Sequence, residues 1–460
     1  MSEQVRVLSV YEGFFSGGAR ILHSDVLAGL HGWRGQRHSV LSIHGEMYRE
    51  STHQLMEQDV CYRKLVAAGL SVSTLGHGVG GARPFDEADL AAATRLFAAA
   101  DVVLTLKEQP LRLVNQIDVR NRPVITCLHR SDPQNQGPSF QALSEAAFSG
   151  RLSAGVCCAH STRQAYAEAG IPADLLHVIP NGVDLRRFRP SRPARAAVRA
   201  AQGIPAAAPV IAFAARYDPM KNVALFLAAT GHFLDRHPDG HVLMFGAGMS
   251  TANPALLADL AAAGLAGFVG GPGEVGAQGG RGRRGGAGTE GAAAGAGAGL
   301  GSRIHLLGSR PDPETLFAAA DVVALTSAYG EAAPLCLIEG MLCGAVPVAT
   351  DVGDSALIVE GRGLIAPPVA EAVAEAWTQA LTHRTMFQQA ATRSRHQFGR
   401  SRMISAYGAL IRQTYRAAPR TVWFPAIPMP SVGACVPVQL RPVAVPVVAV
   451  AASAENMAAL

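Results

Sequence analysis

Residues Ala328 to Asp351 read AYGEAAPLCLIEGMLCGAVPVATD, and this stretch decides how the chain is interpreted. It contains two glutamates, Glu331 and Glu339, with seven residues between them. A turn-forming segment comes first, an apolar helical run carries the second glutamate, and Gly344 then leads into a short apolar strand. This order predicts one carboxylate on a loop and the other about two turns along the following helix.

Size and composition favour a protein with more than one domain. The chain has 460 residues, 49% of them hydrophobic, so it contains enough apolar side chains for two or three cores. Its net charge is +5, from 40 basic and 35 acidic residues. This near balance gives no argument for a nucleic-acid partner.

Cysteine usage and the N-terminus indicate a cytoplasmic protein. The cysteine count is odd and no Cys-x-x-Cys is present, which favours free thiols in a reducing compartment. The N-terminal residues MSEQVRVLSVYEGFF lack the pattern of a secretory signal, and no apolar run reaches the length of a membrane span. We expect any membrane contact to be peripheral, at the inner face. The cysteines are Cys61, Cys127, Cys157, Cys158, Cys336, Cys343 and Cys435.

Short apolar runs alternate with amphipathic helical stretches along most of the chain. Such alternation predicts parallel sheets covered on both faces by helices. In the first half we expect strands at Val5–Val10, His38–Ile43, Leu70–Leu75, Val102–Leu106, Val124–Leu128, Ala154–Cys158 and Leu176–Ile179. In the second half we expect them at Val210–Ala214, Val242–Phe245, Ile304–Leu307, Val322–Leu325, Val346–Thr350 and Leu364–Ile365.

The two glutamates and a second motif together resemble a known family. Residues 178–190 read VIPNGVDLRRFRP, which is similar to the interdomain signature of the retaining glycosyltransferases of family 4, also called group 1. The Glu331–Glu339 spacing resembles the Glu-x7-Glu signature of the same family. The resemblance implies a GT-B fold, in which two Rossmann-like domains face each other across a cleft and a C-terminal helix crosses back to the first domain. The donor nucleotide would lie on the second domain and the acceptor on the first.

With this resemblance, the chain divides into five segments. We expect an N-terminal acceptor domain at residues 1–190, a linker at 191–209, and a nucleotide-sugar domain at 210–385. A crossing-back helix follows at 386–418, and a tail rich in proline and valine at 419–460. A glycine-rich stretch, 270–301, is predicted to be a disordered insertion.

Arginines gather near the C-terminus, where eight of them from Phe387 onward stand against one acid, Glu455. We favour a solvated helix face over a patch that binds anionic lipid by about two to one, because no dense apolar face accompanies the charge.

Arg216 and Lys221, in AARYDPMKN, have the right charge to stabilise a leaving diphosphate. They lie at the end of a strand and the start of a helix, where a phosphate would also meet helical N–H groups. Taken alone, the pair is more simply explained as two solvated cations. Beside Glu331 and Glu339, it resembles the family's Arg-x4-Lys pair, and the resemblance implies that both residues stabilise the leaving group.

The resemblance also assigns roles to the glutamates and to the loop between them. Glu339 would accept hydrogen bonds from the donor's ribose, and Glu331 would contact the transferred sugar. A charge in the apolar run around Glu339 also needs a partner on physical grounds. After the first glutamate the family commonly has Gly-Phe, whereas this chain has Ala332-Ala333, whose backbone amides are expected to face the diphosphate.

Two further loops resemble donor-site loops of the family. Gly17, Gly18 and Arg20 follow the first strand, as does the family's N-terminal glycine loop, although a Gly-Gly pair also suits an ordinary strand-to-helix turn. Gly246 and Gly248 resemble the family's Gly-x-Gly turn beside the nucleotide, which is a weak signal because dinucleotide sites have similar glycines.

His129 ends a strand, where α/β sheets bind ligands, and the family has a histidine near the transferred sugar at a similar point. A capping or core histidine is equally consistent with the sequence. No Asp-x-Asp motif or histidine cluster with ligand spacing is visible, so we expect neither a metal nor another cofactor.

The resemblance implies a hexosyltransferase that moves a sugar from a UDP- or GDP-sugar to a hydroxyl acceptor with retention, in glycan, polysaccharide or glycoconjugate biosynthesis. The acceptor would be a sugar, a lipid-linked sugar or a small molecule, selected by loops such as Ile43–Gln58 and Arg130–Ser139. Two alternatives remain open. One is a hydrolase or epimerase acting on a nucleotide sugar, and the other is a non-catalytic protein that binds one.

Overall fold

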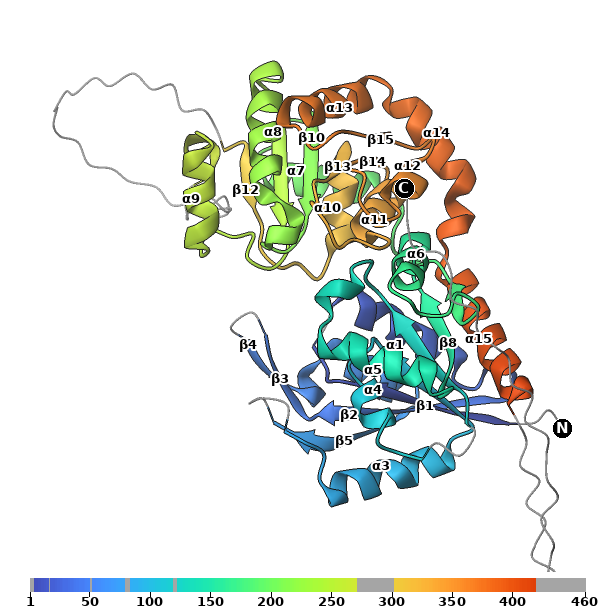
Figure 1. Cartoon of the computed structure of the whole chain (residues 1–460). Coiled ribbons are helices and arrows are strands. Elements are labelled where there is room, and N and C mark those ends of the chain that lie inside the picture. The colour runs from blue at the N-terminus through green and yellow to red at the C-terminus, as the bar shows by residue number, and fades with distance from the viewer. Residues whose placement is uncertain are drawn as a thin grey trace, which may run out of the picture. The chain divides into compact units, whose positions relative to one another are not determined.

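The computed structural model describes residues 4–15, 17–49, 52–78, 83–118, 122–270 and 302–418. Contacts between Cα atoms group the chain up to Pro419 as one compact unit, and this unit contains two large parallel sheets (Figure 1). The predicted insertion at 270–301, apart from its first residue, and the predicted tail at 419–460 lie outside the described residues.

The first sheet has seven strands in the order β5-β2-β1-β6-β7-β8-β9, and every neighbouring pair is parallel. All residues of β6 and β7 are buried, as expected for strands covered on both faces. The strands are β1 (Val5–Tyr11), β2 (Gln36–His44), β5 (Ser71–His77), β6 (Val102–Leu106), β7 (Val124–Leu128), β8 (Leu152–Cys157) and β9 (Leu176–Val178). The helices are α1 (Gly18–Leu30), α2 (Val60–Ala67), α3 (Glu87–Ala99), α4 (Leu111–Val114), α5 (Pro138–Phe148) and α6 (His160–Glu168).

The second sheet has six parallel strands in the order β12-β11-β10-β13-β14-β15. They are β10 (Val210–Ala214), β11 (His241–Phe245), β12 (Ile304–Leu306), β13 (Val322–Leu325), β14 (Val346–Ala349) and β15 (Leu364–Ile365). The associated helices are α7 (Arg192–Ala201), α8 (Val223–Arg236), α9 (Pro254–Ala262), α10 (Pro313–Ala319), α11 (Leu335–Leu342), α12 (Ser355–Val359) and α13 (Ala370–Thr382).

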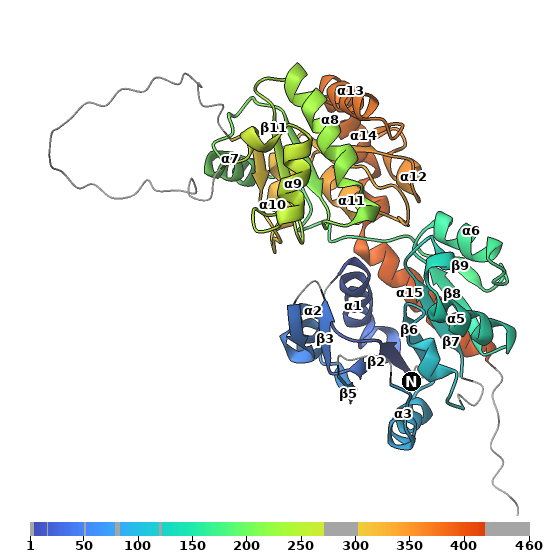
Figure 2. The same ribbon diagram turned by 60° about the vertical axis from the view of Figure 1, so that its left-hand side comes forward.

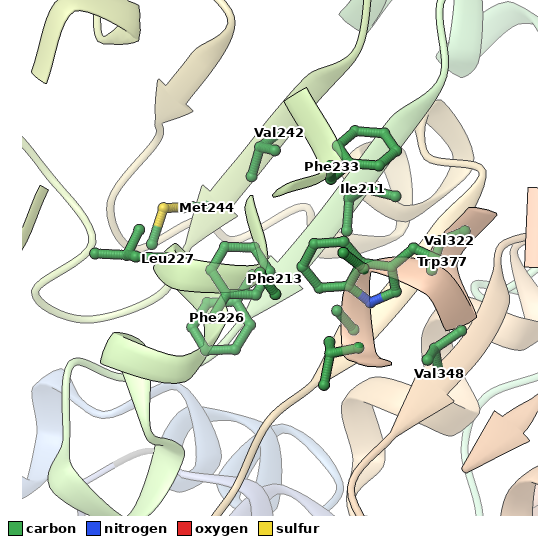
Figure 3. Packing of buried hydrophobic residues seen from close by; sticks show 14 of the residues in the cluster. Ile211, Phe213, Phe226, Leu227, Phe233, Val242, Met244, Val322, Val348 and Trp377 are labelled. Atoms are coloured by element: carbon green, nitrogen blue, oxygen red, sulfur yellow. The ribbon is translucent and has the colours of Figure 1, made fainter. Parts of the chain in front are cut away.

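Aromatic side chains fill the core on one face of the second sheet. Phe213 on β10 stacks on Phe226 of α8 with 4.1 Å between ring centroids, and Trp377 of α13 lies 5.4 Å from Phe226 (Figure 3). All three side chains are essentially inaccessible to water. This packing holds α8 and α13 against the sheet, which fixes the loop that joins β10 to α8.

In each sheet the strand order reverses at the strand that comes first in the chain, which is β1 in the first sheet and β10 in the second. In the first sheet β1 lies between β2 and β6, and in the second β10 lies between β11 and β13. Ligands of such open sheets bind beyond the carboxyl ends of the strands at this reversal. The segments that follow β1, β10 and β13 are therefore the places to look for a site.

The predicted crossing-back helix 386–418 is two helices. α14 (Arg384–Ser394) ends in a short 3-10 turn (Arg395–Phe398), and α15 (Arg400–Ala417) begins after Gly399. The break lies where Gly399 pairs with Val183 of the interdomain segment in an isolated bridge. The chain therefore changes direction where it passes the connection between the sheets.

α15 packs against α1 of the first sheet, as a crossing-back helix should (Figure 2). Its buried face consists of Met403, Tyr407, Gly408, Leu410 and Ile411. The expectation that no dense apolar face accompanies the arginines was therefore wrong for this helix. The apolar face was missed because its residues recur at helical spacing, and arginines and small side chains lie between them in the sequence.

Three features of the first half were not predicted: a β-hairpin, helix α2 and the short helix α4. A β-hairpin forms from β3 (Glu46–Arg49) and β4 (Thr52–Leu55), within the Ile43–Gln58 segment that the sequence predicts to be a loop, and α2 follows it.

The described cysteines are all free, as predicted, and Cys435 lies outside the described residues. Within the described ranges, no helix is long and apolar enough to cross a membrane.

Candidate functional site

Lys221 and Glu331 meet at the carboxyl edge of the second sheet. Lys221 ends a 3-10 turn after β10, and Glu331 lies between β13 and α11. The Lys221 ammonium contacts the Glu331 carboxylate, although the two residues are 110 positions apart. Ser327 Oγ donates a hydrogen bond of 2.6 Å to the same oxygen, Oε1. The fold therefore joins the two motifs that the sequence singled out separately.

Backbone contacts hold the segments of this pair together. Thr326 Oγ1 donates to the carbonyl oxygens of Lys221 and Asn222, at 3.1 and 3.2 Å. The N–H of Ala328 donates to the carbonyl of Met220 at 2.9 Å. Because β10 and β13 are neighbouring parallel strands, the segments that follow them leave the sheet side by side. The geometry of the pair is thus set by the sheet as well as by the two side chains.

Arg216 lies at the same edge, immediately after β10. Its guanidinium is 3.3 Å from the carboxylate of Asp218, and 41% of its side chain is exposed. Arg216 therefore presents a positive charge near solvent, while Lys221 is 15% exposed. The two predicted cations share the sheet edge but differ in how deeply they are buried.

Glu339 has a different environment from Glu331. It lies on α11, which packs so closely on β13 that a Cβ on Gly340 would be 2.7 Å from Val323. The Glu339 side chain is half-buried, and burial raises the pKa of its carboxyl to about 8, against the opposing effect of the Arg187 cation. Among the described residues, no hydrogen bond or ion pair of this carboxylate is found. Such a group is suited to accepting hydrogen bonds from a ligand.

The loop from Glu331 to Ala333 has its carbonyl groups occupied. They accept hydrogen bonds from Ser131 Oγ, from the N–H of Asp354 and from Asn181 Nδ2, respectively. The N–H groups of Glu331 and Ala332 donate to no acceptor in the described part of the chain. The next helix, α11, has no side-chain cap because its N-cap residue is Pro334. Uncapped N–H groups at the start of a helix favour an anion.

Gly246 and Gly248 follow β11 beside the start of the β10 loop. Gly246 has a φ of +132°, and a Cβ there would lie 2.0 Å from the carbonyl oxygen of Ala215. Gly248 has a φ of +76°, and a Cβ there would lie 2.8 Å from Cβ of Tyr217. Only glycine fits either position without a shift of the backbone. The tight turn brings the β11 edge against residues that flank Arg216.

At the edge of the first sheet, Gly18 begins α1 and Gly17 is its N-cap residue. A Cβ on Gly18 would lie 3.3 Å from Cδ1 of Leu335 on α11, whereas nothing lies within 4 Å of one on Gly17. The Arg20 guanidinium donates to the carbonyl of Phe15, and burial lowers its pKa. Ser16, which belongs to the same predicted loop, lies outside the described residues.

His129 follows β7 at the edge of the first sheet. Burial, with a smaller effect from the Lys107 cation, lowers the pKa of its imidazole to about 3. The ring is therefore neutral near pH 7. Its Nε2 atom is buried and has no hydrogen-bond partner in the ranges that the structure describes. A buried ring nitrogen of this kind is available to a ligand hydroxyl.

Sequence reasoning missed the residues that hold the Glu331 loop. Ser131 and Asp354 both bind it, from 200 positions before Glu331 and from beyond β14 respectively. Neither residue belongs to a motif, and a serine or aspartate in a loop is too common to single out. Among the residues in the structure, no group of three or more histidine, cysteine or acidic side chains is arranged to hold a metal ion.

Two family models match the chain. The model described as "Glycosyltransferase Family 4" matches residues 65–187, and the one described as "Glycosyl transferases group 1" matches residues 280–383. The second match contains both Glu331 and Glu339. The resemblance to the family 4, or group 1, glycosyltransferases is confirmed.

Curated glycosyltransferases also match part of the chain. A D-inositol 3-phosphate glycosyltransferase of Nocardia farcinica is 32% identical over 202 residues, which are 42% of this chain and 36% of that protein. One of Mycobacterium bovis is 30% identical over 225 residues, which are 48% of this chain and 38% of that protein. The matched regions thus span well under half the length of these relatives.

Solved glycosyltransferase structures share the fold. Anabaena HepE in complex with UDP superposes with a TM-score of 0.68 at 18% identity, covering 89% of this chain and all of that chain. The sucrose-phosphate synthase of Thermosynechococcus elongatus gives a TM-score of 0.60 at 17% identity, covering 90% of this chain and all of that chain. The fold is therefore GT-B, with two parallel-sheet Rossmann-like domains.

Proposed function

We propose that this protein is a glycosyltransferase that moves a sugar from a nucleoside diphosphate sugar to a hydroxyl acceptor. The observation that carries the proposal is the contact between Lys221 and Glu331, at the edge where an open sheet binds ligands. The contact brings together a cation and a carboxylate from two motifs that the family resemblance assigns to the same donor.

The second sheet supplies what a diphosphate needs. Lys221 and Arg216 contribute positive charge, and the unoccupied N–H groups of Glu331 and Ala332 lie before the uncapped start of α11. As the sugar leaves, negative charge grows on the phosphate oxygens, so fixed cations and N–H groups lower the barrier. These groups can do so without a metal ion.

The two glutamates would bind the hydroxyl groups of the donor. The Glu339 carboxylate, which has no protein partner in the described ranges, would accept hydrogen bonds from the ribose. Glu331 is occupied by Lys221 and Ser327, and we assign it to the transferred sugar, with Lys221 turning toward the diphosphate. Ligand hydroxyls would thereby replace a contact within the protein.

The first sheet would hold the acceptor. His129 is neutral, so its free Nε2 is suited to a hydroxyl and less suited to an anionic group. The matched relatives are named for an inositol phosphate acceptor, which makes a phosphorylated polyol the first acceptor to test. Retention of the anomeric configuration is proposed from the family resemblance. In that mechanism the leaving phosphate accepts the acceptor's proton on the face where the new bond forms.

Nucleotide release by the purified chain tests the proposal. UDP-, GDP-, ADP- and dTDP-sugars are each supplied without added metal, with inositol phosphate, a polyprenyl-phosphate sugar or a small alcohol as acceptor. We expect release from one donor to depend on an acceptor and to be lost in Glu339→Ala. Glu371→Ala is the matched control, because the Glu371 side chain is 72% exposed on α13.

Three outcomes would count against the proposal. Release of free sugar that no acceptor accelerates would indicate a hydrolase. Saturable donor binding without turnover in any mixture would indicate a protein that only binds the nucleotide sugar. If the protein binds none of the donors, neither a glycosyltransferase nor a protein that binds a nucleotide sugar is supported.

A further inference from the structure

Side chains from the first half of the chain hold the Glu331–Ala333 loop of the second half. Ser131 Oγ donates to the carbonyl of Glu331, and Asn181 Nδ2 donates to that of Ala333 at 3.3 Å. Between them, the methyl group of Ala332 packs in a small buried cluster with Cys158 and Ala159. The loop that precedes α11 is thus seated on the segment that joins β8 to α6.

Asp354 links this loop to the start of α6. Its own N–H donates to the carbonyl of Ala332 at 2.7 Å. Its carboxylate accepts hydrogen bonds from the N–H groups of His160 and Ser161, at 2.7 and 2.8 Å. Asp354 is 7% exposed, so water competes little for these bonds.

Helix α6 lacks a cap from its own sequence. Its N-cap residue is Ala159, whose methyl group cannot accept a hydrogen bond. The first N–H groups of a helix need acceptors, and a carboxylate there also interacts favourably with the helix dipole. Asp354 supplies this cap from 194 positions further along the chain. The cap exists only while the β14 loop lies against α6.

The turn before Asp354 is shaped for the same contact. Gly353 has a φ of +63°, and a Cβ there would lie 2.5 Å from the carbonyl oxygens of Glu331 and Ala332. A larger residue would push the turn away from the loop and would displace the Asp354 N–H from its acceptor. The backbone is therefore packed to place Asp354 between the loop and the helix.

We infer that Asp354 is a positioning residue that fixes the Glu331–Ala333 loop by capping α6, so that the loop and its N–H groups are set in place by the first half of the chain. Asp354 touches no substrate group in this scheme. Its effect on turnover rests on the proposed function, whereas its capping of α6 does not. When the two halves separate, the loop loses its contacts with Ser131 and Asn181, and α6 loses its cap at the same time.

Hydrogen exchange of the substrate-free protein tests the capping directly. In Asp354→Ala the amides of His160 and Ser161 should exchange about five- to tenfold faster, because a lost cap costs about 1 kcal/mol. The segment 329–337 should also exchange faster. Glu360→Ala is the control, because Glu360 is exposed at the end of α12, and it should change neither segment. Unchanged exchange at His160 and Ser161 in folded Asp354→Ala would overturn the inference.

Kinetics test the positioning role. Asp354→Asn, which keeps one acceptor oxygen, should recover part of the protection and part of kcat, and the dissociation constant for the nucleoside diphosphate should change by less than about twofold. Ser131→Ala acts on the same loop from the other side and removes a single hydroxyl, so it also serves if Asp354→Ala fails to fold. It should lower kcat without changing exchange at α6. If Asp354→Asn and Ser131→Ala each lose nucleotide binding in proportion to kcat, the positioning role is overturned. Absence of turnover in the wild type would count against the proposed function and would leave the exchange test standing.

Discussion

The carboxyl edges of the two sheets differ in which of their polar atoms already have partners. At the second sheet the Glu339 carboxylate has none in the described ranges, whereas Glu331 does. At the second sheet, Glu331 is bound by Lys221 and Ser327 before any ligand is present. At the first sheet, Nε2 of His129 and Nε of Arg20 are buried without hydrogen-bond partners in the described part of the chain. Unpaired buried polar atoms cost stability, so a protein that keeps them gains when a ligand binds there.

Glycines at the two edges differ in the same sense. Gly246 has a positive φ and no room for a Cβ, whereas Gly17 has an extended backbone and open space around it. The second edge is therefore rigidly built and the first is more permissive. This contrast fits the proposed function, in which the nucleotide would bind at the rigid second edge and the acceptor at the more permissive first edge. The five predictions that follow test it, from the largest expected effect to the smallest.

Replacing Glu331 with glutamine should have the largest effect on turnover. The amide keeps the size of the side chain but removes the charge that pairs with Lys221. Loss of one preorganised electrostatic group at a reacting centre lowers kcat by roughly 10²–10³-fold. Steady-state kinetics measure it, with whichever donor the nucleotide-release panel selects. Glu371→Gln, at an exposed position on α13, is the control. Equal kcat in wild type and Glu331→Gln would mean that the second edge is not where the reaction occurs.

Gly246→Ala should destabilise the second domain, and Gly17→Ala should not. The alanine at 246 must adopt a φ of +132° with its Cβ 2.0 Å from a carbonyl oxygen. Strain and overpacking of this kind cost about 2–4 kcal/mol. Gly17→Ala should change the free energy of unfolding by less than about 1 kcal/mol. Denaturant unfolding of both variants measures the difference, and similar losses in the two would remove the contrast between the edges.

Nucleotide affinity should rise with pH through the titration of Glu339. Its carboxyl has a pKa of about 8 in the free protein, so it is mostly protonated at pH 7. Ribose hydroxyls that donate to the carboxylate favour its ionised form, and binding would therefore release a proton. Affinity should increase by up to about tenfold per pH unit below pH 8 and level off above it. Calorimetric titration across this range should give a flat profile for Glu339→Gln.

The same group predicts how folding stability depends on pH. The folded-state pKa lies above the ordinary value, so the folded protein holds more protons than the unfolded chain between the two. Stability from this group is complete at acidic pH and is lost as pH rises toward 8. Glu339→Gln should lack this loss. A wild-type stability that increases with pH relative to the variant would contradict the assignment.

His129→Phe should have a small effect on folding stability, whereas it should lower activity. Phenylalanine removes the buried Nε2 that has no partner and keeps a flat ring. Stability should stay level or rise by about 1 kcal/mol, while kcat falls because an acceptor contact is lost. Thermal unfolding and kinetics on one preparation measure both. A large loss of stability would show that the imidazole serves the core of the first domain and that no ligand needs it.

Much of the fold could be predicted from local patterns. Buried strands such as Val102–Leu106 and Val124–Leu128 begin and end where the apolar runs do. These elements follow from hydrophobic periodicity and turn residues, which act over a few positions. The β3–β4 hairpin was missed because its strands are short and polar, so they have no clear alternation.

The sequence by itself determined two parallel sheets, the family and the residue types at the second edge. It did so because glycines, apolar runs and paired glutamates are local patterns, which can be recognised in the sequence without knowing which residues are in contact. Only the tertiary structure decided that Lys221 meets Glu331 and that Asp354 caps α6. These contacts depend on how parallel strands bring distant loops to one edge, and nothing local to either partner records the other. The same holds for the pKa of Glu339, which is raised because the surrounding fold removes water from its carboxyl.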